Sequence, residues 1–195
     1  MEADWSVALA VADPVITVPW AAGDDEPNCR FVDLRVEPHL IDEVEEAQGR
    51  PPLRSALLRL NGAASHLWTA KCDAWGSSPE QGDAPFDPYE MDAEPGETAF
   101  GAGSYIDLLP RDALTRGCFD SVEQWMRAVT TRLRAVPASA ARVELVLRRA
   151  RIDAAPGFGV TWFVEGCGAT AQRADESWGR ALDLALAAIM DVPLA

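Results

Sequence analysis

Apolar and polar residues alternate most clearly in the second half of the chain. Residues 104–109 and 158–164 are short runs rich in apolar and β-forming side chains, and residues 142–152 alternate between apolar and polar positions. Both patterns are typical of β-strands, in which successive side chains point to opposite faces of a sheet. We therefore predict three strands in this half of the chain.

Two further segments of the same half repeat their apolar residues with the period of a helix. Asp120 and Glu123 have the spacing of a capping box, and the large apolar residues that follow recur at every third or fourth position as far as Pro137. Residues 174–190 carry a second stripe of this kind, so both segments are predicted to be amphipathic helices. The predicted order of strand, helix, strand, strand and helix is most of a split βαβ, or ferredoxin-like, unit.

The first half of the chain shows a shorter version of the same order. Residues 31–36 alternate as a strand, residues 38–47 place their apolar side chains on one helical face, and residues 66–75 are again predicted to be a strand. Residues 53–61 fit either a helix or a strand. The similarity between the two halves makes internal duplication one interpretation of the sequence.

These elements predict an α+β fold with two layers, in which helices cover a mainly antiparallel sheet. A chain of 195 residues is long enough for one sizeable hydrophobic core, so we expect a single domain over residues 1–195. Within this domain, half-modules 1–75 and 104–195 would be joined by residues 76–103.

Residues 76–103 fit neither the strand pattern nor the helix pattern. They contain four prolines, five glycines and seven acidic residues, and no basic residue. A connection of this length inside a compact domain is usually either functional or disordered. We expect its large apolar side chains to anchor parts of it to the body of the protein.

Charge is strongly segregated along the chain. Residues 72–110 hold nine acidic residues and no basic one, whereas residues 111–151 hold nine arginines and four acidic residues. The net charge is −14 and Lys71 is the only lysine. This balance argues against nonspecific binding to nucleic acids and to anionic membranes, because both need clustered cations. A basic protein partner fits the charge better.

The first hypothesis is therefore a non-catalytic binding or regulatory protein that presents an acidic surface to a basic protein partner. Such surfaces steer association and give specificity. Two aromatic residues of the acidic segment would supply the apolar anchors that interfaces favour. The partner surface would consist of Asp83, Phe86, Asp87, Tyr89, Glu90, Asp92, Glu94 and Glu97.

A second hypothesis is intramolecular. The acidic segment would fold onto the basic half of the same chain, so that charge segregation stabilises the fold. Added salt would then destabilise the protein, because salt screens exposed ion pairs. The basic surface would consist of Arg127, Arg132, Arg134, Arg148 and Arg149.

A third hypothesis is an enzyme or a small-ligand binder. Lysine can act as a base when burial shifts its pKa, which arginine cannot do, and alternation places Lys71 and Asp73 on the same face of a strand. Asp107 lies inside an otherwise apolar strand, where a carboxylate needs partners or a shifted pKa. The candidate ligand site would consist of Lys71, Cys72, Asp73 and Asp107.

The sequence contains no recognisable cofactor or metal motif. The four cysteines lie far apart without a CxxC pair, and only two histidines are present, so we expect no metal and no cofactor. Residues 166–171 have the spacing G-x-G-x-x-A, which we interpret as a tight turn from strand to helix, because too little chain follows for a dinucleotide fold. Cys167 within it is the best candidate for a reactive thiol, since a helix N-terminus favours thiolate, but we favour the alternative that it is a buried, inert cysteine.

The N-terminal segment and the apolar runs bear on the expected location of the protein. The N-terminal segment is acidic and only briefly apolar, which does not match a secretory signal. No apolar run approaches the length of a membrane helix. We expect a cytoplasmic protein with reduced thiols.

Overall fold

A computed structural model describes residues 1–20, 30–81 and 85–194 of the chain, and six strands within them form one open sheet. Two short strands pair parallel to β5 along its outer edge, whereas β5, β6, β4 and β3 pair antiparallel in that order. The strands are β1 (Glu2–Ala8), β2 (Ile16–Val18), β3 (Leu67–Ser77), β4 (Phe100–Pro110), β5 (Ala141–Ile152) and β6 (Ala155–Gly168). The predicted α+β class and mainly antiparallel sheet are confirmed.

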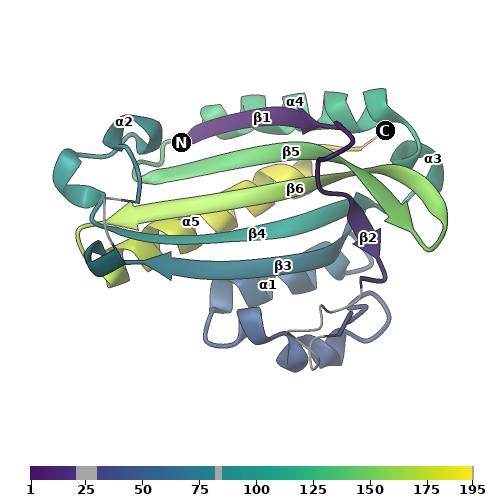
Figure 1. The fold of residues 1–195 in the computed structure, drawn as a ribbon, viewed down its shortest axis with the longest axis horizontal. Helices are drawn as coiled ribbons and strands as arrows, with labels where there is room; N and C mark the ends of the chain where they lie inside the picture. The colour runs from purple at the N-terminus through teal and green to yellow at the C-terminus, as the bar shows by residue number, and fades with distance from the viewer. Residues whose placement is uncertain (21–29, 82–84, 195) are drawn as a thin grey trace.

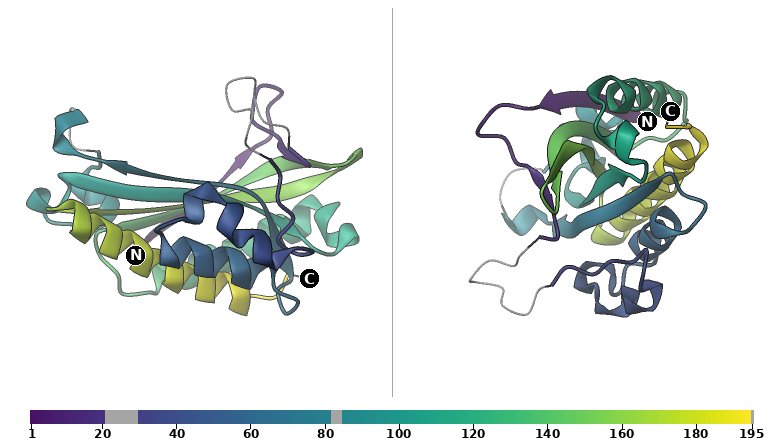
Figure 2. Two further views of the ribbon diagram at one scale, coloured as in Figure 1. Left: turned by 90° about the horizontal axis from the view of Figure 1, so that it is seen from below. Right: turned by 90° about the vertical axis from the view of Figure 1, so that its right-hand side faces the viewer.

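Three long helices cover one face of this sheet (Figure 1; Figure 2, left). They are α1 (Pro51–Asn61), α4 (Phe119–Arg134) and α5 (Ala171–Asp191), and their apolar sides pack against Leu145 of β5, Trp162 of β6 and Ile106 of β4. All three of these strand residues are completely buried. Burial of apolar surface between the helices and the sheet is therefore the main source of stability.

Two glycines bring α5 close to the end of β6. A methyl group on Gly166 would overlap the backbone nitrogen of Trp178, and one on Gly168 would overlap the backbone of Arg173 and Ala174. The glycines of the G-x-G-x-x-A segment thus have a packing role, which explains their presence without a bound phosphate.

Among the described residues, no long helix covers the opposite face of the sheet. At one end it is covered by β2, where Ile16 and Val18 bury Trp68 and Leu109 in a second, smaller core. At the other end it is bordered by the β3–β4 connection, residues 78–99, in which Met91 is completely buried. Figure 2 shows these two segments rising beyond the sheet at its opposite ends.

The strand face between these two ends is the open face. Its side chains alternate with those that enter the main core. It consists of Asp4, Asp73, Trp75, Tyr105, Asp107, Arg142, Glu144, Val146, Arg148, Thr161, Phe163 and Glu165.

Short helical segments connect the strands. The β3–β4 connection contains η3 (Pro79–Gln81), α2 (Pro88–Met91) and η4 (Pro95–Glu97). The ends of the acidic segment belong to strands instead, because β3 extends to Ser77 and β4 begins at Phe100. The described part of the connection is therefore shorter and more ordered than its composition suggests.

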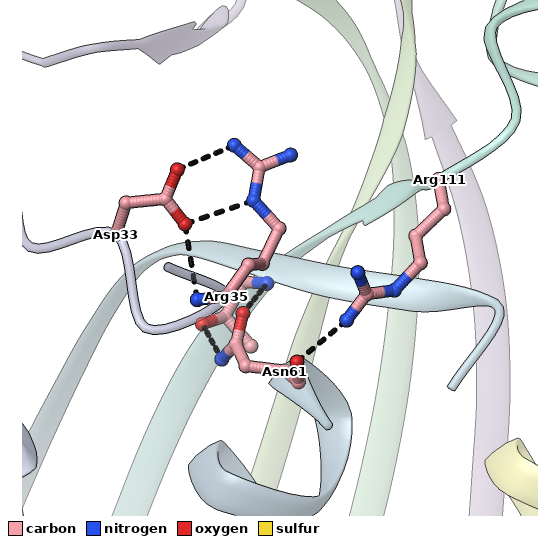
Figure 3. Close-up of polar contacts among 5 residues, drawn as sticks. Asp33, Arg35, Asn61 and Arg111 are labelled. Carbon is pink, nitrogen blue, oxygen red and sulfur yellow. Dashed lines mark hydrogen bonds and ion pairs between the residues drawn. The ribbon is translucent and has the colours of Figure 1, made fainter. Parts of the chain in front are cut away.

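Residues 31–36 form a turn, so the strand predicted there is wrong. The Asp33 carboxylate accepts hydrogen bonds from the backbone N–H and the guanidinium of Arg35, and the Asp33 carbonyl accepts one from the N–H of Val36 (Figure 3). These local bonds satisfy the backbone within the segment, which removes the need for a neighbouring strand.

Two of the helix predictions also need correction. Residues 38–47 form two short 3₁₀ helices, η1 (Pro38–Glu43) and η2 (Glu45–Ala47), instead of one α-helix. Helix α4 begins at Phe119 with Cys118 as its N-cap, so Asp120 lies inside the helix and the predicted capping box does not form. The ambiguous residues 53–61 are helical and belong to α1.

The C-terminal end of α1 is held by an arginine from the end of β4. Arg111 donates from its guanidinium to the carbonyl of Asn61 (Figure 3), and also to the carbonyls of Gly62 and Leu67. The Asn61 side chain in turn hydrogen-bonds both the backbone and the hydroxyl of Thr69 on β3. These bonds satisfy carbonyls that a helix end otherwise leaves unpaired, and they fix α1 against the edge of the sheet.

Candidate functional site

An aromatic pair occupies the centre of the open face. The strand register places Asp4, Glu144, Phe163, Tyr105 and Asp73 in one row across five neighbouring strands. The rings of Tyr105 and Phe163 are 5.9 Å apart between centroids and both are half-buried. Burial and the nearby Asp107 raise the pKa of the tyrosine, which therefore stays uncharged. This row thus has an aromatic centre with acidic residues at its ends.

A tryptophan enlarges this aromatic surface towards the β3–β4 connection. In the next row, Trp75 of β3 lies opposite Gly103, which in turn lies opposite Glu165 of β6. A methyl group on Gly103 would come within 2.6 Å of the Trp75 ring, so the ring lies across the glycine. The absence of a side chain at Gly103 therefore lets Trp75 cover β4.

Three carboxylates, two on the open face and one on the β3–β4 connection, lie around a single arginine. Arg142 lies 3.3 Å from a carboxylate oxygen of Glu90 and 3.9 Å from one of Glu144. The adjacent Glu165 is half-buried, and its pKa is raised mainly by burial and further by the charges of Glu144 and Glu90. A single positive charge therefore balances only part of the negative charge of this cluster.

A chain of hydrogen bonds crosses the sheet on the other side of the aromatic pair. The Arg148 Nε–H donates to the Thr161 hydroxyl at 2.8 Å, and this hydroxyl donates to the Asp107 carboxylate at 2.6 Å. Burial raises the pKa of Asp107 to about 6, although the hydrogen bond from Thr161 and the charges of Arg148 and Lys71 act in the opposite direction. Asp107 is thus a carboxyl group that can change its charge near neutral pH.

The structure brings together three of the four residues of the predicted ligand site. Strand β3 has a bulge between Thr69 and Cys72, which sets the exposed Lys71 near Asp107 on β4. Asp73 follows on the open face, beside Tyr105. Cys72 instead enters the main core, and burial strongly raises the pKa of its thiol. Cys72 therefore lies on the opposite face of β3 from Asp73 and does not belong to the same site as Asp73 and Asp107.

The predicted partner surface lies largely on the β3–β4 connection at the end of the open face. Phe86 packs against Gly101 of β4, whereas Tyr89 is 92% exposed. Asp87 caps the first turn of α2 by accepting from the Tyr89 N–H, and Glu90 pairs with Arg142. The connection and Glu2 of β1 also line a shallow acidic groove with Asp92, Glu94 and Glu97. Asp83 lies outside the described residues.

The intramolecular hypothesis is wrong for the described residues. The arginines it invokes bind other groups: Arg127 pairs with Glu123, Arg132 with Asp191, Arg134 with Asp4, Arg148 with Thr161, and Arg149 with the Ala10 carbonyl. The one described ion pair between the β3–β4 connection and the basic half is Glu90–Arg142. The acidic side chains of the connection therefore mostly face solvent.

The surroundings of Cys167 confirm the interpretation of this residue as a buried, inert cysteine. Cys167 is completely buried, and burial raises its thiol pKa to about 11, which disfavours the reactive thiolate. Cys118, which the sequence did not single out, is exposed, and its pKa is lowered mainly by hydrogen bonds from Ser121. Among the described residues, no group of three or more histidine, cysteine or acidic side chains is arranged to hold a metal ion.

Several residues of the open face were missed by the sequence analysis. Trp75, Tyr105, Phe163, Glu144 and Glu165 all occupy polar or aromatic positions in alternating strands. The alternation of Thr161, Phe163 and Glu165 along β6 was a usable signal, because it predicts one face of a strand that does not enter the core. Alternation does not give the order of the strands in the sheet, and this order places the residues beside one another.

Comparisons with protein families, with curated proteins and with solved structures give no match to this chain. None of the helices in the described residues has the length and apolar composition needed to cross a membrane.

Proposed function

We propose that this protein binds a basic protein partner through its open face and the adjoining β3–β4 connection, without catalysing a reaction. The observation that carries the proposal is the central row of the open face, where Phe163 and Tyr105 lie between Glu144 and Asp73. Aromatic faces attract the cationic ends of lysine and arginine, and adjacent carboxylates strengthen this attraction.

The charge balance of the open face supports the same proposal. Asp73, Asp107 and Glu165 form no ion pair with any described residue. Each of these carboxylates is close to an aromatic side chain, so a cation that binds there gains both contacts. The net charge of −14 also accelerates the approach of a basic partner at low ionic strength.

The β3–β4 connection adds an anchor at the edge of this surface. Tyr89 is 92% exposed although its neighbour Met91 is completely buried. The short helix α2 therefore holds Tyr89 in place at the end of the open face while its ring remains free for contact. Exposed tyrosines held in this way are frequent among the residues that dominate binding energy at interfaces.

The test uses an arginine-rich decapeptide and its glutamate-substituted counterpart as probes, with binding followed by calorimetry at low salt. We expect the protein to bind only the basic peptide. The double variant Glu144→Gln, Glu165→Gln should weaken binding about tenfold, which corresponds to about 1.4 kcal/mol. Affinity should also fall as salt is added.

A matched control removes the same charge from the helical side of the molecule. Asp175 and Asp183 are exposed on α5, so Asp175→Asn, Asp183→Asn should leave binding nearly unchanged. If this control weakens binding as much as the open-face variant, only net charge matters and the proposed surface is wrong. A lack of any binding to the basic peptide at low salt would also overturn the proposal.

A second candidate function is a small-molecule enzyme or ligand binder with a site near Lys71, Asp73 and Asp107. The observation in its favour is the pKa of Asp107, raised to about 6, because proton-transferring groups often have pKa values close to neutrality. Binding of a neutral small molecule that is independent of salt, and lost in Asp107→Asn, would favour this alternative.

The finer predictions from the sequence also remain proposals. A split βαβ order is supported by β6, which lies between β4 and β5, two strands connected through α4. Internal duplication has less support, because the first half lacks the strand expected at residues 31–36. A cytoplasmic location with reduced thiols fits the cysteine spacing and is tested by fractionation of the cell.

A further inference from the structure

A cleft lies along the outer edge of β3, beside the open face. It separates β3 from residues 30–46, which include η1 and the start of η2, and Trp20 forms one of its walls. The Trp20 indole N–H donates to the Ala70 carbonyl on β3 at 3.0 Å. This bond fixes the indole against the strand edge, so the wall of the cleft is already formed before any ligand binds.

The floor of the cleft is apolar. It is lined by Leu34, Leu57 and Cys72, whose exposed fractions are 5%, 2% and 8%. The Cys72 thiol is uncharged because burial raises its pKa. A ligand in this cleft therefore gains free energy when it places an apolar group on the floor.

The rim of the cleft carries an ammonium group, that of Lys71, and two carboxylates, those of Glu45 and Glu46, that form no ion pair with a described residue. Glu46 is half-buried, and its carboxylate forms no ion pair or side-chain hydrogen bond with a described residue. Lys71 likewise forms no ion pair there, and its ammonium lies 5.4 Å from the centroid of the Trp20 ring. Arg30 and Glu43, the next charged residues of the lining, pair with each other.

The size of the cleft restricts the ligand further. Its volume is about 130 Å³, which is below the several hundred Å³ of sites for drug-sized molecules. A whole nucleotide is therefore too large for it. A compact molecule with the dimensions of an amino acid is compatible with this volume.

We infer that this cleft is a binding site for a small zwitterion that carries an apolar group, such as an aliphatic amino acid. Glu46 binds the ammonium group of the ligand, Lys71 binds its carboxylate, and Leu34 and Leu57 contact its side chain. The inference does not depend on the proposed binding of a basic partner, because Glu46, Leu34 and Leu57 lie outside the open face.

The test follows the Trp20 indole N–H resonance by NMR while leucine is added at millimolar concentration. We expect a saturable shift of this resonance. N-acetyl-leucine lacks the ammonium group and leucine amide lacks the carboxylate, so each should bind about tenfold more weakly than leucine. Glycine has no apolar group and should bind weakly as well. This series uses the unmodified protein, so it does not depend on the folding of any variant.

Two variants then assign the contacts. Glu46→Gln should reduce the affinity for leucine but not that for N-acetyl-leucine, and Lys71→Met should reduce the affinity for leucine but not that for leucine amide. The control is Glu37→Gln, because Glu37 is exposed on the same segment and makes no side-chain capping bond. The inference is overturned if leucine causes no saturable shift, if the analogues bind as well as leucine, or if the control weakens binding equally.

Discussion

At the scale of single residues, Asp107 has the least ordinary environment on the open face. Its folded-state pKa is raised from 3.8 to about 6, so the folded protein binds more protons than the unfolded chain between these two values. The contribution of Asp107 to the free energy of unfolding is therefore fully present below about pH 4, and it is lost as the pH rises through about 6.

We predict that Asp107→Asn removes this loss of stability. Asparagine keeps an oxygen that accepts from Thr161 and carries no charge to bury. The variant and the parent should unfold at similar urea concentrations near pH 4, and the variant should be more stable by on the order of 2 kcal/mol near pH 7. Parallel pH profiles of the two proteins between pH 4 and 7 would show that the carboxyl group is not desolvated.

The hydrogen-bond partner of Asp107 could not be predicted from the sequence. An acid inside an apolar strand can be recognised as needing a partner, and that prediction correctly singles out Asp107. Its partner Thr161 is 54 residues away in the sequence, and only the pairing of β4 with β6 brings the two together. Asp33 also lies within a predicted strand, but it pairs with Arg35 two residues away, and this local pair stabilises a turn in place of the strand.

At the scale of elements, the contact between α5 and β6 depends on Gly166. A methyl group at this position would overlap the backbone of Trp178 on α5, and a helix backbone cannot rotate aside as a side chain can. We predict that Gly166→Ala destabilises the protein by about 1–3 kcal/mol in urea unfolding. Gly96→Ala is the control, because nothing lies within 4 Å of the added methyl group. If the two substitutions lower the free energy of unfolding equally, α5 can shift away from β6 with little loss of stability, and the prediction is wrong.

The elements that were predicted correctly have a strong local signal. Helices α4 and α5 and strand β5 repeat a clear period over many residues, and strands β4 and β6 are marked by runs rich in apolar and β-forming side chains. The failures are short segments. Residues 38–47 contain only a few apolar positions, and two 3₁₀ turns bury Ile41 and Ala47 as well as one α-helix would.

At the scale of the whole molecule, the sequence predicts two layers but not which residues the uncovered face presents. Each of β3 to β6 has two faces, and helix periodicity alone does not say that α1, α4 and α5 all lie on the same side. In the structure all three lie on one side (Figure 2), so the strand residues that point to the other side become neighbours on one uncovered face. The acidic and aromatic character of that surface therefore emerges only from the assembled sheet.

The last prediction concerns the effect of added salt on the melting temperature, which the two hypotheses expect to change in opposite directions. If the acidic connection were held by the basic half, added salt would lower stability by screening attraction. In the structure most carboxylates of the connection and of the open face lack cationic partners, and the net charge is −14, so repulsion dominates. We therefore predict that the melting temperature rises between about 0.01 M and 0.15 M salt, as the screening length falls from about 30 Å to 8 Å.

The double variant of the open face tests whether this repulsion comes from the carboxylates around Arg142. Glu144→Gln, Glu165→Gln removes two of the crowded carboxylates around Arg142, so its melting temperature at low salt should be higher and should change less with salt. The same charge change on α5, in Asp175→Asn and Asp183→Asn, should have a smaller effect, because these side chains are exposed and well screened by water. A melting temperature that falls with added salt would contradict this prediction. It would instead support the hypothesis that attraction between the acidic and basic halves of the chain stabilises the fold.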